Sequence, residues 1–451
     1  MTKLINKHKK EYITRSREFF KLTSPIFLEQ TFIVMMGIIT TIMVSTVGAH
    51  ALAAVSMVDP ISHLVAAFFN ALTIGATIVV AQYTGRGDTG KSSGVAAQAI
   101  LLAVGLGVAL GILIALFRSP IVNFLFRNAD QSVLEDSKLF LGLISLSFPA
   151  MAVMMTAFGV LRGSGNTKAP MVITILINII NVVLGLNLIP HLGVVGAALA
   201  LVSSRYVGAI LGMIYLLKKS QTIRFSIRDF TPNFEVQRLI LRFGIPTTIE
   251  SGTFQFGKLI ITVFVAGMGT AAIAANAVVS SISSILNSPG SAFSTGATIL
   301  VGQRIGRGDV DDVRKTTYFA VITAALTLTV ICIVTFFLLD PIISLYYVTP
   351  EMLAIMRPVL ITLVIAMPTA WPPSFVTPGA VRATGDVKYA MVVAITSMLL
   401  IRVAFAYILG VHFGLGILGV WLSMYADWIL RGICFVSRIA GSKWQGKAVV
   451  K

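Results

Sequence analysis

Residues 75–88, GATIVVAQYTGRGD, and residues 296–309, GATILVGQRIGRGD, are two versions of one stretch. The second lies 221 positions after the first, and the offset needs no gap over a much longer part of the chain. It relates these pairs: Pro25 and Pro246, Glu29 and Glu250, Gly48 and Gly269, Pro120 and Pro341. Such an internal repeat predicts that the chain contains two copies of one structural unit.

The composition indicates a membrane protein. Hydrophobic residues make up 56% of the chain and charged residues 12%, which leaves too few charges to cover a water-soluble domain. Uncharged apolar runs of about 20 residues recur and predict membrane-spanning helices. The two cysteines, Cys332 and Cys434, lie in such runs, so they indicate neither a disulfide framework nor a metal site.

Twelve spans are predicted, six in each copy, and the fold class is therefore an all-α membrane protein. They lie near residues 23–47, 51–83, 92–117, 136–161, 169–189, 193–217, 240–267, 271–303, 313–338, 353–381, 389–412 and 416–437. The second and eighth spans are longer than a straight crossing needs, so we expect them to tilt or bend.

The distribution of basic residues predicts the orientation of the chain. One set of loops, together with both termini, carries most of them: Arg86, Lys91, Arg162, Lys168, Lys218, Lys219, Arg224, Arg228, Arg304, Arg307, Arg314, Lys315, Arg382 and Lys388. The positive-inside rule places these loops and both termini in the cytoplasm. The net charge of +17 is then a topology signal. It does not indicate nucleic-acid binding, because the basic residues are spread over short loops without an aromatic-lined patch.

Six spans per copy bring both copies into the membrane in the same direction, so two pseudo-symmetric six-helix bundles are expected. The predicted segments are a cytoplasmic amphipathic N-terminal segment (1–22), two bundles (23–217 and 240–437), a cytoplasmic linker (218–239) and a cytoplasmic tail (438–451). The first segment is too long and too polar for a signal peptide. Two parallel-related bundles without a catalytic motif are typical of a secondary transporter that works by rocking them.

Several motifs, taken together in their order and spacing, resemble the multidrug and toxic compound extrusion (MATE) family. They are P-x3-E at 25–29 and 246–250, GAHALAA at 48–54, the two GRGD turns, RGSGNTK at 162–168 with RATGDVK at 382–388, GVVGAA at 193–198, DWILRG at 427–432 and GSKW at 441–444. The resemblance covers about residues 20–445. It implies a twelve-helix, V-shaped antiporter that expels organic cations or other amphipathic compounds in exchange for protons or sodium.

The chain departs from that family where ions are coupled. Many members carry an Asp in the middle of span one, and the equivalent position here is Thr40. In span five, Asn181 is followed four residues later by Gly185 rather than by an Asp, and Leu201 replaces a Thr in span six. Sodium needs several clustered oxygens, so we expect the proton to be the coupling ion and sodium to be the less favoured one. No metal site and no cofactor are expected.

Glu29 and Glu250 form a symmetric pair of intramembrane carboxylates, each about 10 Å from the cytoplasmic end of its helix. Such residues are costly inside a membrane and usually face a cavity or a partner. Either they bind protons or gate the bundle interface, or they accept hydrogen bonds and lock the packing of their own bundle. Arg205 and Arg402 are interpreted as structural or interfacial partners.

Asp59, His63 and Lys258 have no ionisable counterpart in the other copy, so they mark where the copies have specialised. Asp59 and His63 are one helical turn apart. We hypothesise that Asp59 supplies the carboxylate that the family places at Thr40, and that Lys258 pairs with it in one conformation and so couples protonation to rocking. The structural alternatives are a cap before Pro60 for Asp59, a core imidazole for His63 and a helix-positioning ion pair for Lys258.

Polar and adaptable side chains provide candidates for a substrate cavity. Gln255 and Asn276 are the strongest polar candidates, although such residues also join helices within a bundle. Met36, Phe254 and Trp371 are candidate apolar linings, because Met and aromatic side chains adapt to varied ligands. Thr40 and Asn181 complete the predicted cavity.

The favoured function is a proton-coupled multidrug antiporter, for which a monomer suffices, in the plasma (inner) membrane of a prokaryote. Its partners are small organic substrates and the lipid bilayer. A lipid-linked sugar flippase would favour a strongly cationic cavity, to which only Lys258 contributes by this interpretation. An enzyme with Asp59 and His63 as an acid/base pair is disfavoured, because no nucleophile, HExxH motif or phosphate loop accompanies them. An inactive receptor or scaffold remains an alternative.

Overall fold

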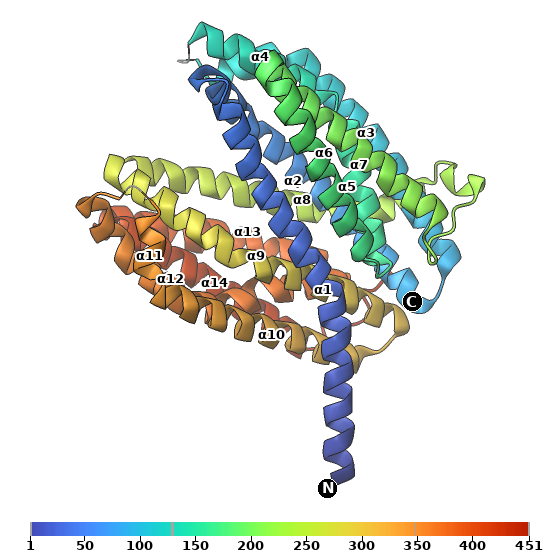
Figure 1. Cartoon of the computed structure of the whole chain (residues 1–451). Coiled ribbons are helices and arrows are strands. Elements are labelled where there is room, and N and C mark those ends of the chain that lie inside the picture. The colour runs from blue at the N-terminus through green and yellow to red at the C-terminus, as the bar shows by residue number, and fades with distance from the viewer. Residues whose placement is uncertain (1, 128–129, 347, 450–451) are drawn as a thin grey trace. The chain divides into compact units, whose positions relative to one another are not determined.

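The computed structural model describes residues 2–127, 130–346 and 348–449, and all secondary structure within them is helical (Figure 1). The first copy consists of α1 (Thr2–Ser45), α2 (Ala49–Arg86), α3 (Thr89–Leu125), α4 (Gln131–Ser145), α5 (Phe148–Gly163), α6 (Lys168–Leu192) and α7 (Val194–Lys218). The short turn η1 (Ile227–Phe230) follows in the connecting segment. The second copy consists of α8 (Phe234–Ala266), α9 (Thr270–Arg307), α10 (Val310–Phe337), α11 (Leu339–Ser344), α12 (Pro350–Ala383), α13 (Val387–Thr396), the π-helical turns η2 (Ser397–Val403) and η3 (Ala406–His412), and α14 (Gly416–Ala440).

The prediction of an all-α membrane protein is confirmed. Within the described residues, 11 helices are long and apolar enough to cross a membrane, or 12 if the bent pair α4 and α5 is one span. The N-terminal segment does not form a separate element, because α1 continues from it into the first span without a break.

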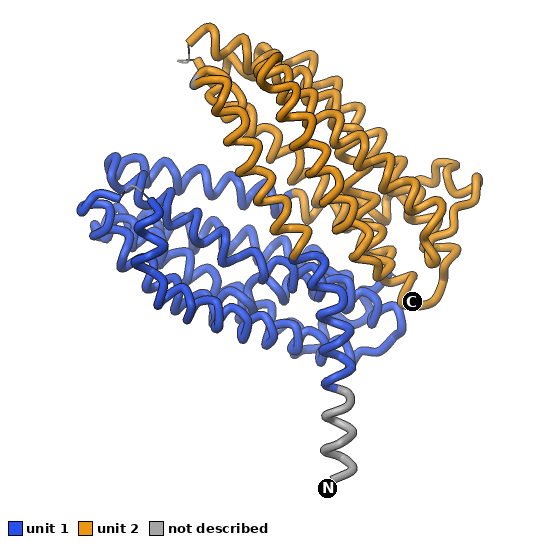
Figure 2. The backbone as a smooth tube through the Cα atoms, viewed as in Figure 1, with its two compact units in different colours: residues 1–27, 249–451 blue, residues 28–248 orange. Residues whose placement is uncertain are grey.

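The chain packs as two compact units of similar size (Figure 2). Unit 1 contains residues 1–27 and 249–451, and unit 2 contains residues 28–248. The division falls inside α1 and inside α8. The first half of α1 belongs to unit 1 and its second half to unit 2, whereas the first half of α8 belongs to unit 2 and its second half to unit 1.

The repeated GAT stretch provides a close helix contact in each unit. In unit 2, a Cβ on Gly75 of α2 would lie 2.9 Å from the backbone nitrogen of Gly244 on α8. In unit 1, a Cβ on Gly296 of α9 would lie 2.3 Å from a side-chain carbon of Thr23 on α1. Glycine is needed at position 75 because the partner backbone passes so close, and at position 296 because the Thr23 side chain fills the space. Since Gly244 and Thr23 are 221 positions apart, the first half of α8 packs in unit 2 as the first half of α1 packs in unit 1.

The GRGD turns connect consecutive long helices in both copies. Gly87 and Gly308 end α2 and α9 in the left-handed conformation, with φ of 80° and 77°. The next residue caps the following helix: Asp88 accepts a hydrogen bond from the backbone N–H of Lys91, and Asp309 accepts one from that of Asp312. The motif therefore combines a glycine C-terminal stop with an aspartate N-cap.

The predicted span 136–161 is a broken helix. α4 and α5 meet at an angle of 49°, and α5 has Pro149 in its first turn. Residues of α7 hold the break: Arg205 donates a hydrogen bond to the Ser147 hydroxyl at 2.7 Å, and the Tyr206 hydroxyl donates to the Leu146 carbonyl at 2.9 Å. These bonds satisfy polar groups that the broken helix exposes.

The eleventh span contains π-helical turns that its counterpart α6 does not have. Lys168 and Lys388, at the start of the two helices, are 220 positions apart. A Cβ on Gly196 would meet the backbone of Leu188, and a Cβ on Gly419 would meet the backbone of Leu409. Leu188 and Leu409 therefore occupy equivalent positions, and they are 221 positions apart. One residue is thus added within the eleventh span, and the π-helical turns accommodate it.

Candidate coupling and substrate sites

Glu29 of α1 is held by an arginine within unit 2. Its side chain is 1% exposed, and Arg162 in the last turn of α5 donates to its Oε1 at 2.5 Å. The Thr174 hydroxyl lies 3.4 Å from the same oxygen, whereas the buried Oε2 has no hydrogen-bond partner among the described residues. This pair ties the first span to the C-terminal end of α5.

Glu250 of α8 makes the equivalent contact within unit 1. Nη1 of Arg382, in the last turn of α12, lies 2.9 Å from both carboxylate oxygens, and the two side chains are 14% and 15% exposed. Glu250 is therefore less enclosed than Glu29. These arrangements correspond to the packing alternative for the symmetric carboxylates, because each one is already paired with a cation.

Asp59 lies on the exposed surface of α2 in unit 2, one turn before the exposed His63. It is within electrostatic range of His63 and of Arg205 on α7. Among the described residues it forms no ion pair at contact distance. Asp59 thus differs from Glu29, because it is exposed and is not held in an ion pair at contact distance.

Asn181 of α6 and Ser204 of α7 form another polar pair in unit 2. The Asn181 amide, 5% exposed, donates to the Ser204 hydroxyl at 3.1 Å. Ser204 precedes Arg205, so the bond fixes α7 at the position from which Arg205 reaches the α4–α5 break. We name Asp59, His63, Asn181, Ser204 and Arg205 the polar belt of unit 2.

Two residues predicted for the cavity lie on α1, which contributes its second half to unit 2. Met36 and Thr40 are half-buried and are one turn apart. No hydrogen bond of the Thr40 side chain is found among the described residues. Their role in a cavity stays a prediction.

Lys258, Phe254 and Arg402 come together in unit 1, and we name them the cation cluster. Nζ of Lys258 lies 5.1 Å from the centroid of the Phe254 ring, and the guanidinium carbon of Arg402 lies 5.3 Å from the same centroid. Both distances are within the range of cation–π attraction. Lys258 is exposed, whereas Phe254 and Arg402 are half-buried.

The other candidates of unit 1 have different environments. Gln255 is exposed beside the cation cluster. Asn276 of α9 accepts a hydrogen bond from the Trp421 indole at 3.0 Å, which joins α9 to α14. Trp371 is 3% exposed and stacks on Phe375 at 4.8 Å in the core of unit 1, so its ring is covered in this structure.

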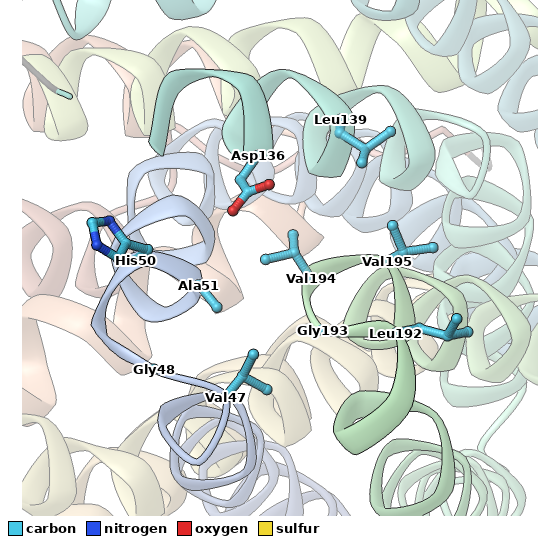
Figure 3. A pocket seen from close by; sticks show the side chains of 10 residues that line it. All are labelled: Val47, Gly48, His50, Ala51, Asp136, Leu139, Leu192, Gly193, Val194 and Val195. Atoms are coloured by element: carbon cyan, nitrogen blue, oxygen red, sulfur yellow. The ribbon is translucent and has the colours of Figure 1, made fainter. Parts of the chain in front are cut away.

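A pocket of about 320 Å³ lies in unit 2, at the ends of helices predicted to face away from the cytoplasm (Figure 3). It is formed by the turn between α1 and α2, the α4 helix and the turn between α6 and α7. Its lining residues are Val47, Gly48, His50, Ala51, Asp136, Leu139, Leu192, Gly193, Val194 and Val195. The Asp136 carboxyl group is directed towards the middle of this pocket (Figure 3). The polar belt and the cation cluster contribute no residue to it.

Sequence reasoning did not identify the arginine partners of the two glutamates. Arg162 and Arg382 open the matching stretches RGSGNTK and RATGDVK, and that repetition was the available signal. No group of three or more His, Cys, Asp or Glu side chains suited to a metal ion occurs within the described residues.

The MatE family model matches residues 25–186 and 246–408. An uncharacterized transporter, YisQ, of Bacillus subtilis is 30% identical over 442 residues, which cover 95% of each chain. A probable multidrug resistance protein, NorM, of Thermotoga maritima is 27% identical over 96% of this chain and 94% of its own.

Two solved structures have the same fold. One is a MOP superfamily transporter from Pyrococcus furiosus that is described as having a binding pocket of reverse polarity, with a TM-score of 0.86. The other is an outward-facing multidrug resistance MATE family transporter, also with a TM-score of 0.86. Each is 22% identical to this chain, and the match covers 95% of this chain and 97% of the other.

Proposed function

This chain belongs to the MatE family of membrane transporters, and from that we propose that it is a secondary active antiporter that exports amphipathic or cationic organic compounds in exchange for protons. Relatives named as multidrug resistance proteins support the substrate class. Bacterial relatives support a location in the plasma membrane. We propose that a single chain suffices for transport there.

Asp59 is the observation that carries the coupling proposal. Glu29 and Glu250 are paired with arginines at contact distance, whereas Asp59 is an exposed carboxylate on a membrane-spanning helix without such a pair among the described residues. An ionised carboxylate attracts an organic cation, and protonation removes that attraction. Competition between proton and substrate for Asp59 would therefore produce exchange rather than co-transport.

Arg205 and His63 belong to the same electrostatic environment. Arg205 is anchored by its bond to Ser147, so it contributes a fixed positive charge beside Asp59. We propose that His63 is a second proton-binding group one turn away, and that Lys258 acts on substrate rather than on Asp59. Sodium coupling is less favoured, because the polar belt does not provide several clustered carboxylate oxygens within the described residues.

Purified protein in vesicles tests this function. Efflux of a fluorescent organic cation is expected under a pH gradient alone and not under a sodium gradient alone. Asp59→Asn should bind the cation more weakly and lose gradient-driven transport. Asp136→Asn, which changes a carboxylate in the outer pocket, is the matched control and should transport normally.

Transport driven by sodium at constant pH would exclude proton coupling. Movement of a lipid-linked sugar, without efflux of any organic cation, would identify a flippase instead. Asp59→Asn with the wild-type rate and unchanged pH dependence would remove Asp59 from the mechanism.

A further inference from the structure

In unit 1, two cationic side chains from membrane-spanning helices contact the same aromatic ring. Lys258 of α8 and Arg402 of η2 both lie over Phe254, at 5.1 Å and 5.3 Å from its centroid. The two cations are within electrostatic range of each other. Since like charges repel, the cation–π contacts alone leave this arrangement in need of a compensating anion.

The described carboxylates of unit 1 do not supply that anion. Neither Lys258 nor Arg402 forms an ion pair within the described part of unit 1. Asp427 is within electrostatic range of Arg402, but it is 0% exposed, and its Oδ2 lies 3.7 Å from Nη1 of Arg431. The surroundings of the cation cluster thus contain three cations, Lys258, Arg402 and Arg431, and one carboxylate, that of Asp427, so the net charge there is positive.

Lys258 also lies deep within the span. It precedes the end of α8 by eight residues, or about 12 Å by helical rise. An ammonium group at such a depth is costly against hydrocarbon. Lys258 is exposed, as is Gln255 on the same face of α8. An exposed ammonium group at this depth costs less beside water-accessible space than against lipid, so we infer that this face borders such space.

The geometry of the cation cluster suits an aromatic anion. The guanidinium fork matches the two oxygens of a carboxylate, and Nε of Arg402 is buried without a hydrogen-bond partner among the described residues. The half-buried Phe254 ring offers an apolar surface beside both cations. Arg402 also lies in a π-helical turn, a local structure that is frequent at functional sites.

We propose that the cation cluster binds the anionic group of the transported compound. The substrates would then be amphipathic organic compounds with a carboxylate or a similar anionic group beside an aromatic ring, zwitterions among them. This inference rests on the proposed export function and narrows its substrate class. It also gives Lys258 a role in substrate binding in place of proton coupling.

The test uses two dyes that differ at one group, a xanthene dye with a free carboxylate and its methyl ester. Binding to the full-length protein in nanodiscs of neutral lipid is measured by fluorescence anisotropy. The wild type should bind the carboxylate dye about tenfold more tightly than the ester, as expected for a hydrogen-bonded charge pair. Lys258→Gln and Arg402→Gln should each remove most of that preference without weakening ester binding.

Two variants provide controls. Lys258→Arg retains the charge and should keep the preference for the carboxylate dye. Lys91→Gln removes another lysine that lies over an aromatic ring, that of Tyr83 at 5.9 Å in a cytoplasmic turn, and should change nothing. Equal binding of the two dyes by the wild type would overturn the proposal, as would an unchanged preference in both glutamine variants.

A second arm adds phosphatidylglycerol to the nanodiscs, because a lipid headgroup is another source of an anion. Dye preference should persist. If the anionic lipid abolished it, the cluster would be a headgroup site and the substrate assignment would fail. Efflux of the ester dye under a pH gradient tests the export function separately, so lost efflux with retained dye preference would count against export alone.

Discussion

Arg162 and Glu29 are joined by a 2.5 Å contact between α5 and α1 in which the carboxylate is almost fully buried. The equivalent pair, Arg382 and Glu250, has carboxylate and guanidinium both about one-seventh exposed. The two copies therefore retain the same ion pair at different degrees of burial. Removing one partner of a buried pair leaves an uncompensated charge, and its cost rises with burial.

Arg162→Gln is expected to destabilise the protein by about 3–5 kcal/mol, and Arg382→Gln by less, because Glu250 can be reached by water. The measurement is the apparent Tm of each purified variant in the same detergent. The double variant Glu29→Gln with Arg162→Gln should recover part of the loss, since no charge is then left unpaired. Equal losses for Arg162→Gln and Arg382→Gln would contradict the burial argument.

The break between α4 and α5 gives a second prediction. Arg205→Met removes the hydrogen bond to Ser147 and should increase amide hydrogen exchange around residues 144–149. Tyr206→Phe removes a more exposed bond to Leu146, worth about 1 kcal/mol, and should have a smaller effect. Hydrogen exchange is measured by mass spectrometry. Equal increases in exchange for Arg205→Met and Tyr206→Phe would contradict this role of Arg205.

Gly290 gives a third prediction. A Cβ at this position of α9 would lie 2.2 Å from the Trp371 ring, so Gly290→Ala forces the core to shift. Overpacking of this type costs about 1–3 kcal/mol. Gly252→Ala is the matched control, because a Cβ there meets nothing within 4 Å, and it should be neutral or stabilising. Thermal unfolding compares them, and combining Gly290→Ala with Trp371→Phe should restore stability if the ring causes the strain.

The C-terminal residues give a fourth prediction. Trp444 is 1% exposed and its indole donates to the Ile439 carbonyl, while Lys447 reaches Asp386 at 2.6 Å. Trp444→Ala should cost about 3–5 kcal/mol locally and release the tail. Tryptic cleavage after Lys443 and Lys447 should then accelerate, with cleavage after Lys91 unchanged as the internal reference. Unchanged tail cleavage would show that Trp444 does not hold it.

The repeat and the apolar runs were sufficient to predict the helical class and twelve spans, where the structure has 11 or 12, because hydropathy and period are local properties of the sequence. The GRGD turns could be interpreted in the same way, since glycine and aspartate act on the adjacent backbone. The broken span was missed although Pro149 was visible, because the apolar run continues through it. A proline disfavours helix in the residue before it, and this was the available signal.

The partners of charged residues could not be predicted as well, because they depend on which faces of the helices meet. Arg402 shows the difficulty. One added residue rotates all the residues after it by about 100° around the helix axis. The helix face on which Arg402 lies therefore cannot be assigned by aligning the two copies without a gap. The structure shows Arg402 in a π-helical turn, sharing the Phe254 ring with Lys258.

The division of α1 and α8 between the units has a consequence for biosynthesis. The residues up to Phe27 leave the ribosome well before residues 249–451, yet they pack with those later helices in unit 1. Unit 2, by contrast, is complete once residue 248 has emerged. The start of α1 must therefore remain without its packing partners while most of the chain is inserted. A gene cut in the connecting segment would produce two fragments that each lack a half-helix, and neither could assemble its unit alone.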